Sequence, residues 1–341
     1  MDKFICNMRI FILIFCLALI GCKQDPPTAE SKKPAESNLL EGLDEANNLV
    51  KENPNDAHAY FHRANVFYDH DGFQEAEDDV KKAIELDSNK VEYYHLLADL
   101  HLDNFKSMNA LGTMIKTVKK FPNSTQSKLK LSEFYFILKK YEQSIQTAGS
   151  ILEEDPQNAE AYFMIGMNFR ESGDTSKSIN SFQAAIENDP ELVDAWLILG
   201  SMHESKNDKL ALSYYDGALA VQPDNLIALH SKAYFLQNNG EISKALEIYK
   251  QIMLKDRNYT DAPLNAGILY LELDSFKMAY DHFNILTNNV PESPFGYFYR
   301  GVANEALGNP ENAKEDYETA LRLKPDYAKA QNALDNIGVE Q

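Results

Sequence analysis

His58 and His62 are the side chains whose type and spacing come closest to a chemical site in this sequence. Residues four apart share one face of a helix, so both imidazoles would point the same way, as helical metal ligands do. The nearest candidate for a third ligand is His95. Surface and core histidines on a helical scaffold produce the same pattern, and we therefore predict no metal site.

Clustered carboxylates are the other candidates for chemistry. One run lies between Glu75 and Asp79, and another, Glu153–Asp155, ends just before Pro156. Both are predicted to be solvated, on the outer face of a helix and at a helix end. The sequence also has no glycine-rich phosphate loop, no G-x-S-x-G turn and no H-E-x-x-H pair. We therefore predict no catalytic residue, no cofactor and no small-molecule substrate.

The composition is that of a globular, helix-rich protein. The chain has 341 residues, of which 44% are hydrophobic and 25% are charged, and only 15 are glycine. The formal net charge is −19, which makes the phosphate backbone of a nucleic acid an unsuitable partner. An acidic surface stays compatible with basic or apolar protein partners.

The first 21 residues have the features of a targeting segment. Positive charge comes from Lys3 and Arg9, an unbroken apolar run of 11 residues follows, and the run leads into Leu-Ile-Gly-Cys, ending at Cys22. This order resembles the lipobox of bacterial lipoproteins, in which cleavage occurs just before the cysteine. The resemblance implies a signal peptide at 1–21 and lipidation of Cys22. The alternatives are an ordinary signal peptide or an uncleaved anchor that ends in cysteine.

Residues 22–37 are predicted to be a flexible tether behind the acylated cysteine. They hold three prolines and no aliphatic residue larger than alanine, so they cannot bury enough surface to fold. The residue after Cys22 is Lys23 rather than aspartate. In the best-known bacterial sorting scheme, that choice implies delivery to the outer membrane. We therefore expect a lipid-anchored envelope protein that faces the periplasm.

The rest of the chain repeats with a period of 33 or 34 residues, which is typical of solenoids. Each unit is predicted to form two short amphipathic helices around a turn. In Ala159–Pro190, for example, Gly173 ends the first helix and Pro190 closes the unit. The eight predicted units are 57–90, 91–124, 125–158, 159–192, 193–225, 226–259, 260–293 and 294–325.

Small and bulky residues recur at fixed positions of these units. The eighth position is always alanine, serine or glycine, and a matching position in the second helix is always alanine or serine. Small residues at both positions let the two helix backbones approach closely. Four residues after the second small residue, seven units carry a bulky one: Val80, Met114, Phe182, Tyr215, Tyr249, Phe283 and Tyr317.

The fourth position is aromatic in five units, and a proline closes six. This order of large, small, small, large and proline closely resembles the tetratricopeptide repeat, over Ala57–Pro325. The resemblance implies an all-α fold in which eight helix–turn–helix units stack into one right-handed superhelical solenoid. Stacking is required because no unit can bury its apolar face alone. A lone helix at 38–53 and a helix within 326–341 are predicted to cap the two ends. The prediction is 18 helices with no second domain.

In this family the first helices line a concave groove through their second, fifth, ninth, twelfth and thirteenth positions. Carried over to this chain, the predicted groove residues are Phe61, Asn65, His95, Asp99, Leu129, Phe163, Met167, Arg170, Leu197, His230, Tyr234, Leu264 and Phe298. The apolar members favour recognition of an apolar segment or helix. Packing of some of them on the neighbouring second helix explains the same residues equally well. Family members that bind the acidic C-terminus of cytosolic chaperones use lysines and arginines in the groove. The fifth and ninth positions here have neither residue, which disfavours that role.

The leading hypothesis is a lipid-anchored scaffold that holds other, unidentified envelope proteins in its groove. It has no nucleic-acid partner, and its membrane contact is through the N-terminal lipid. The alternative is a periplasmic protein that binds glycan or peptidoglycan fragments, because tyrosine and phenylalanine rings stack on sugars. No feature of the sequence supports an enzyme.

Overall fold

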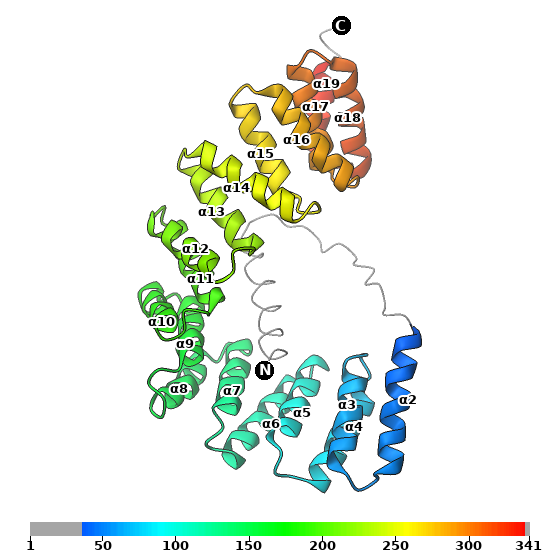
Figure 1. The fold of residues 1–341 in the computed structure, drawn as a ribbon, viewed down its shortest axis with the longest axis vertical. Helices are drawn as coiled ribbons and strands as arrows, with labels where there is room; N and C mark the ends of the chain where they lie inside the picture. The colour runs from blue at the N-terminus through cyan, green and yellow to red at the C-terminus, as the bar shows by residue number, and fades with distance from the viewer. Residues whose placement is uncertain (1–35, 338–341) are drawn as a thin grey trace. The chain divides into compact units, whose positions relative to one another are not determined.

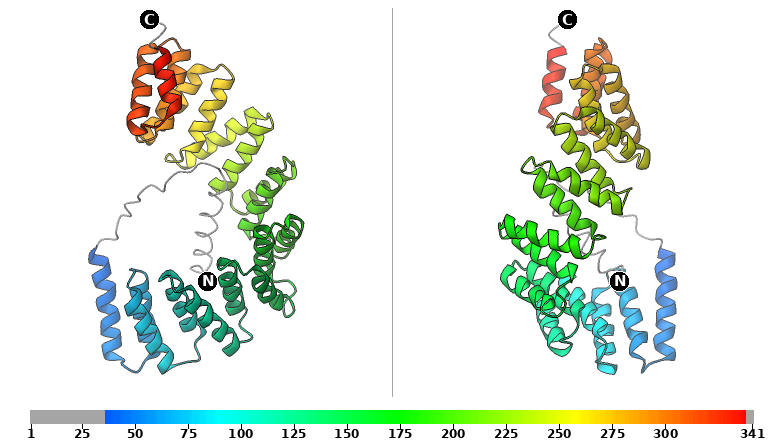
Figure 2. Two further views of the ribbon diagram at one scale, coloured as in Figure 1. Left: turned by 180° about the vertical axis from the view of Figure 1, so that it is seen from behind. Right: turned by 60° about the vertical axis from the view of Figure 1, so that its left-hand side comes forward.

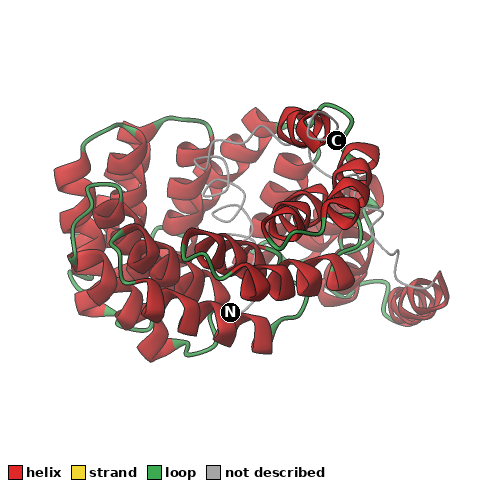
Figure 3. Ribbon diagram, turned by 90° about the horizontal axis from the view of Figure 1, so that it is seen from above, coloured by secondary structure: helices red, strands yellow, loops and turns green. Residues whose placement is uncertain are grey.

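The computed structural model of this protein describes residues 36–337, and this part consists of helices joined by loops, with no strand (Figure 3). Helix α2 (Glu36–Glu52) comes first, eight helix pairs follow, and α19 (Ala328–Ile337) comes last. The first helices of the pairs are α3 (Ala57–Tyr68), α5 (Val91–Asp103), α7 (Thr125–Ile137), α9 (Ala159–Glu171), α11 (Val193–Glu204), α13 (Leu226–Asn238), α15 (Asp261–Glu272) and α17 (Pro294–Ala306). The second helices are α4 (Phe73–Leu86), α6 (Ser107–Lys120), α8 (Tyr141–Leu152), α10 (Thr175–Asn188), α12 (Leu210–Val221), α14 (Ile242–Lys255), α16 (Phe276–Asn289) and α18 (Pro310–Leu323).

The predicted all-α repeat architecture is confirmed, since the 18 predicted helices are all present between residues 36 and 337. Every first helix begins at the first residue of a predicted unit or one residue later. The handedness of the superhelix stays a prediction. The predicted signal peptide, Cys22 and almost all of the tether lie outside the described residues.

The described part of the chain comprises two compact units, which divide between Leu100 and His101. Within the first unit, α2 packs on α3 and α3 packs on α4 (Figure 1). Within the second unit, each helix from α6 to α19 packs on the next one along the chain. Figure 2 shows these helices from two further sides. Some successive first helices also touch directly, for example α15 and α17.

Each helix pair turns through a residue in the left-handed conformation. The residue is equivalent in all eight units, and its φ lies between 52° and 85°. Glycine reaches this region at no cost and asparagine or aspartate at little cost, whereas other residues are strained there by about 1–2 kcal/mol. The eight residues are Asp71, Phe105, Lys139, Gly173, Asn207, Gly240, Asp274 and Gly308.

The small positions bring the paired helices into direct contact, as the sequence predicts. The Ser178 hydroxyl donates a hydrogen bond of 2.9 Å to the backbone carbonyl of Gly166 in the facing helix. A Cβ atom at Gly200 would lie 2.4 Å from the ring of Tyr215, and one at Gly267 would lie 2.4 Å from the ring of Phe283. The bulky side chains therefore fill the space that the glycines leave open.

Three bulky core residues are tyrosines. The hydroxyl of each donates a hydrogen bond to a polar side chain at the twelfth position of its own unit. Tyr317 donates to Glu305 at 2.8 Å, Tyr249 donates to Gln237 at 2.9 Å, and Tyr215 donates to Glu204. In the other five units the bulky position has no hydroxyl. Their twelfth positions are Tyr68, Leu102, Phe136, Arg170 and Leu271. Each of the three buried tyrosine hydroxyls thus has the partner that a buried hydroxyl needs.

We predict that Glu204→Gln reduces the loss of stability on raising the pH. Burial raises the pKa of Glu204, and the hydrogen bond from Tyr215 offsets this only in part. The folded state therefore keeps the proton at pH values where the unfolded state has lost it. The free energy of unfolding falls as the pH rises from the ordinary glutamate pKa through the raised one. Urea unfolding at several pH values measures this slope.

The matched control is Gln237→Glu, which places a carboxyl at the equivalent position beside Tyr249 and is expected to add a similar slope. Equal slopes in wild type and Glu204→Gln would contradict the prediction.

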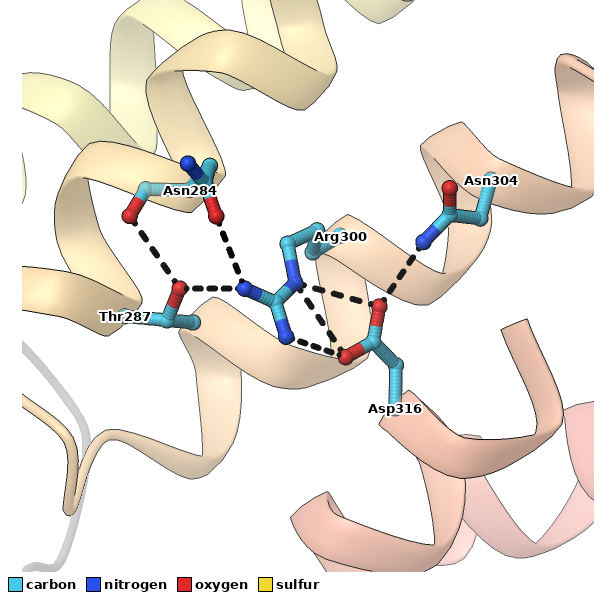
Figure 4. Close-up of polar contacts among 5 residues, drawn as sticks. All are labelled: Asn284, Thr287, Arg300, Asn304 and Asp316. Atoms are coloured by element: carbon cyan, nitrogen blue, oxygen red, sulfur yellow. Dashed lines mark hydrogen bonds and ion pairs between the residues drawn. The ribbon is translucent and has the colours of Figure 1, made fainter. Parts of the chain in front are cut away.

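A buried ion pair joins the last three helices before the C-terminal cap (Figure 4). Arg300 on α17 donates from Nη2 to Asp316 Oδ1 on α18 at 2.7 Å. Its Nη1 donates to Asn284 and Thr287 on α16 at 2.9 and 2.8 Å. Asn304 completes the set by donating to Asp316 Oδ2 at 2.9 Å. The guanidinium thus bridges two repeats, and nearly all of its donors and the carboxylate's acceptors are used.

Candidate functional site

The predicted groove residues fall into two groups in the structure. Phe163 is 1% exposed and packs edge-on against Phe182, with ring centroids 5.4 Å apart. Five of the predicted residues are buried, and this corrects their assignment to an open groove. They are His95, Leu129, Phe163, Met167 and Phe298. The neighbouring second helix covers Phe163, and Phe298 packs against Tyr317 and Tyr327.

The other predicted groove residues keep part of their surface exposed. Asn65 donates to the carbonyl of Phe61 on its own helix at 2.7 Å, and Arg170 pairs with its neighbour Glu171. Both contacts are between residues of the same helix, and they do not join these side chains to another functional group. The half-buried residues are Phe61, Asn65, Asp99, Arg170, Leu197, His230 and Leu264, and Tyr234 is 42% exposed.

His230 and Tyr234 are the two predicted residues that the structure places in a larger polar and aromatic cluster. Both lie on α13, one turn apart, with nearly parallel rings whose centroids are 6.3 Å apart. The ring of His230 also lies 6.1 Å from Tyr249 on α14 and 5.7 Å from Tyr259, which precedes α15. We call His230, Tyr234, Tyr249, Tyr259 and Asn265 the His230 site.

Asn265 on α15 links two members of this cluster by hydrogen bonds. Its Nδ2 lies 3.3 Å from Nε2 of His230 and donates to the Tyr249 hydroxyl at 3.4 Å. The Tyr249 hydroxyl donates in turn to Gln237. Because the amide nitrogen can only donate, Nε2 of His230 accepts, and the proton of the neutral ring lies on Nδ1.

Burial lowers the pKa of His230, and the nearby carboxylate of Asp261 opposes this effect without reversing it. Burial also raises the pKa of Tyr259 to about 12, with Asp261 adding to the shift. At neutral pH the site therefore presents uncharged groups beside one carboxylate. An uncharged site of this kind suits the backbone amides and side chains of a peptide better than a free phosphate or carboxylate.

Two polar atoms of the site stay open to a ligand. Nδ1 of His230 and Oδ1 of Asn265 have no hydrogen-bond partner among the described residues, and neither belongs to the fully buried unpaired atoms. One is a donor and the other an acceptor, which matches the N–H and C=O of a peptide backbone. The exposed ring of Tyr234 supplies an apolar face next to them.

The structure offers no other chemistry at the candidate residues. Over residues 36–337, no three histidine, cysteine or acidic side chains come together as a possible metal site, and His58 and His62 are exposed. Within the same range, no helix has the length and apolar character needed to cross a bilayer.

Sequence reasoning missed three members of the His230 site. Tyr249 occupies the bulky core position, and its position alone gives no sign that its hydroxyl reaches a ligand site. Tyr259 lies in a loop, and Asn265 is one position away from the expected groove positions. An asparagine among the apolar residues of α15 was the available signal, because a half-buried amide needs partners.

Two tetratricopeptide repeat family models match the chain, at residues 163–211 and 294–327. RNA polymerase II-associated protein 3 of Mus musculus is 30% identical over 137 residues, which are 40% of this chain and 20% of that protein. Tetratricopeptide repeat protein 13 of Homo sapiens is 26% identical over 239 residues, which are 68% of this chain and 24% of that protein. The chain spans about a fifth to a quarter of the length of these curated relatives.

Among solved structures, the C-terminal part of a TPR repeat-containing protein from Cytophaga hutchinsonii aligns with a TM-score of 0.58. It is 18% identical, and the alignment covers 72% of this chain and 99% of that one. At this identity the likeness shows the fold. The helix pairs and this structure show an all-α helical repeat fold, and two parts of the chain match tetratricopeptide repeat models.

Proposed function

We propose that this protein is a lipid-anchored scaffold of a bacterial envelope that binds a segment of another protein at the His230 site. The observation that carries the binding proposal is the pair of open polar atoms, Nδ1 of His230 and Oδ1 of Asn265, beside the exposed ring of Tyr234. Stacked repeats present extended surfaces to other proteins, which supports a protein as the ligand.

The chemistry of the site favours recognition over catalysis. Its members are uncharged at neutral pH, and none is activated as a nucleophile by a neighbouring base. The exposed apolar residue Ile227 lies on the same helix as His230 and Tyr234, and Leu264 lies on the helix that carries Asn265. A bound segment would therefore find backbone hydrogen bonds at the centre and apolar contacts around them.

Site-specific photo-crosslinking tests this proposal. A photoreactive phenylalanine analogue replaces Tyr234, and in the control chain it replaces Leu254, which is 77% exposed on α14. We expect a defined envelope protein to be crosslinked from position 234 and not from position 254. Asn265→Leu keeps the size of the side chain but removes its hydrogen bonds, and we expect it to lower the yield about tenfold. Equal crosslinking from positions 234 and 254, or a crosslinking yield that Asn265→Leu leaves unchanged, would refute the site.

The anchor is a separate part of the proposal and has its own test. Cys22 is expected to be the first residue of the mature protein and to carry the lipid. Mass spectrometry of the N-terminal peptide from the cell envelope should show an acylated cysteine, and Cys22→Ser should move the protein out of the membrane fraction. An unmodified Cys22, with a protein in the soluble fraction only, would refute the anchor and leave the His230 site unaffected.

A second candidate ligand is a glycan or peptidoglycan fragment. The exposed ring of Tyr234 beside the amide of Asn265 is the arrangement that would stack on a sugar and accept from its hydroxyls. Calorimetric titration with peptidoglycan fragments separates this candidate from a protein ligand. Heat that disappears in Tyr234→Ala favours the glycan, and its absence at high ligand concentration excludes it.

A further inference from the structure

The segment 104–140 differs in charge from the rest of the chain. It holds eight lysines and one acidic residue, in a chain whose formal net charge is −19. Helix α6 lies within it and has no acidic residue at all. A local excess of lysine in an acidic protein indicates a surface for an anionic partner.

Only some of these lysines reach solvent. Lys128 and Lys130 are buried, and Lys128 pairs with Glu154 at 2.8 Å. Lys116 and Lys119 on α6 and Lys139 in the turn before α8 are exposed. None of these three has a carboxylate partner within the part of the chain that the structure describes. Their charges are therefore not neutralised within the fold.

Large apolar side chains are exposed in the same segment as these lysines. Phe105 is 95% exposed, Met108 is 67% exposed and Ile115 is 44% exposed. Met108, Ile115 and Lys119 follow at spacings of seven and four, so they share one side of α6. The other side packs into the core through the buried residues Ala110, Leu111, Met114 and Thr117. The solvent side of α6 is thus both apolar and basic.

Phe105 stands where folding favours a different residue. It occupies the left-handed turn position with a φ of 56°, and three of the eight equivalent residues are glycine. An aromatic residue is strained there by about 1–2 kcal/mol, and its ring recovers nothing by burial because it is almost fully exposed. The fold therefore gives no reason for a phenylalanine, and a binding role outside the folded chain does.

We propose that this surface docks on an anionic lipid bilayer. The basic–apolar face consists of Phe105, Met108, Ile115, Lys116, Lys119 and Lys139. The lysines contact lipid phosphates, while Phe105 and Met108 enter the interfacial layer. Phe105 lies in no cleft, so it projects in a way that suits a soft, flat interface better than a bound peptide. The proposal takes the presence of a membrane from the proposed lipid anchor, but the surface itself is argued independently of Cys22.

A vesicle co-flotation experiment tests the face. The probe is phosphatidylcholine vesicles with and without phosphatidylglycerol, and the protein is the unlipidated chain from Lys23, which retains all the described helices. The test variant carries Lys116→Glu, Lys119→Glu and Lys139→Glu. The matched control carries Lys250→Glu, Lys314→Glu and Lys329→Glu, which are exposed lysines without a carboxylate partner in the described chain and which give the same net charge.

We expect binding to the anionic vesicles only, at least a tenfold loss of affinity in the test variant, and no comparable loss in the control. Phe105→Gly should weaken binding while raising the melting temperature, whereas Asp274→Gly at the equivalent turn should leave binding unchanged. If Phe105 had only a structural role, Phe105→Gly would change the melting temperature without weakening vesicle binding.

Three results would overturn the proposal: no binding to anionic vesicles, equal binding to neutral vesicles, or equal losses in the test and control variants. Capture of an acidic protein at this face in place of vesicles would likewise replace the bilayer by a protein partner. Because the chain in this assay lacks Cys22, none of these outcomes depends on whether the lipid anchor exists.

Discussion

Replacing Arg300 by methionine is expected to lower the free energy of unfolding of the last repeats by about 3–5 kcal/mol. Asp316 is buried beneath the guanidinium, with only 6% of its side chain exposed. With methionine at position 300, the carboxylate of Asp316 keeps one hydrogen bond, from Asn304, and the acceptors on Asn284 and Thr287 lose the donor that Arg300 supplied. A charge that stays buried without its partner is the main cost. Urea unfolding and hydrogen exchange of the α16–α19 amides measure the loss.

The double variant Arg300→Met with Asp316→Leu separates the buried charge from the loss of packing. It is expected to recover most of the stability, because replacing both members of a buried pair by apolar residues is often close to neutral. The first compact unit offers an independent copy of the arrangement. There Arg63 donates to Asp79 at 2.6 and 2.7 Å and to Asn47 at 3.0 Å. Arg63→Met should destabilise that unit. At either place, the explanation would be contradicted if replacing the arginine alone lowered the free energy of unfolding no more than replacing both members of the pair.

Gly267→Ala is expected to destabilise the protein by about 1–3 kcal/mol, although alanine is the better helix former. The new methyl group would lie 2.4 Å from Cε1 and 2.6 Å from Cζ of Phe283. The ring is fully buried, so it cannot move away without displacing its neighbours. The overlap forces α15 and α16 apart, and thermal unfolding of the purified protein reports the loss.

The matched control for this prediction is Gly149→Ala on α8. A Cβ atom there would meet nothing within 4 Å, and the residue is not in the left-handed region. Alanine should therefore stabilise α8 by about 0.5–1 kcal/mol through its helix propensity. The same substitution is thus expected to have opposite signs at two helical glycines. A neutral or stabilising Gly267→Ala would show that α15 and α16 are not held at the distance that the structure gives.

Much of the fold was predictable from the sequence because its determinants are local. The small residues at the eighth position mark each repeat, prolines close six of the eight units, and the helices begin where these patterns predict. The turn residue is local as well. Gly173 was predicted to end its helix, and it has the left-handed φ of 85° that this role needs. Phe105 shows the limit of the pattern, because the same turn forms there without a glycine.

The binding surfaces were less predictable, because exposure depends on neighbours that the repeat pattern does not specify. Phe163 and Leu264 occupy the same position of two repeats, yet Phe163 is buried and Leu264 is only half-buried. The bulky residue on the next helix does not decide this, because both units have a phenylalanine there: Phe182 lies against Phe163, and Leu264 packs on the cluster that contains Phe283. The His230 site likewise combines residues from three helices and a loop, up to 35 positions apart, and no local motif joins them.

The sequence by itself determined the repeat period, the helix pairs and the local excess of lysine in 104–140, because chain order alone carries these features. The tertiary structure decided which of those lysines face solvent, which predicted groove residues are core, and where His230 meets Asn265. The physical reason is that helix formation and turns follow from neighbours along the chain, whereas burial, hydrogen bonding and pKa shifts follow from neighbours in space.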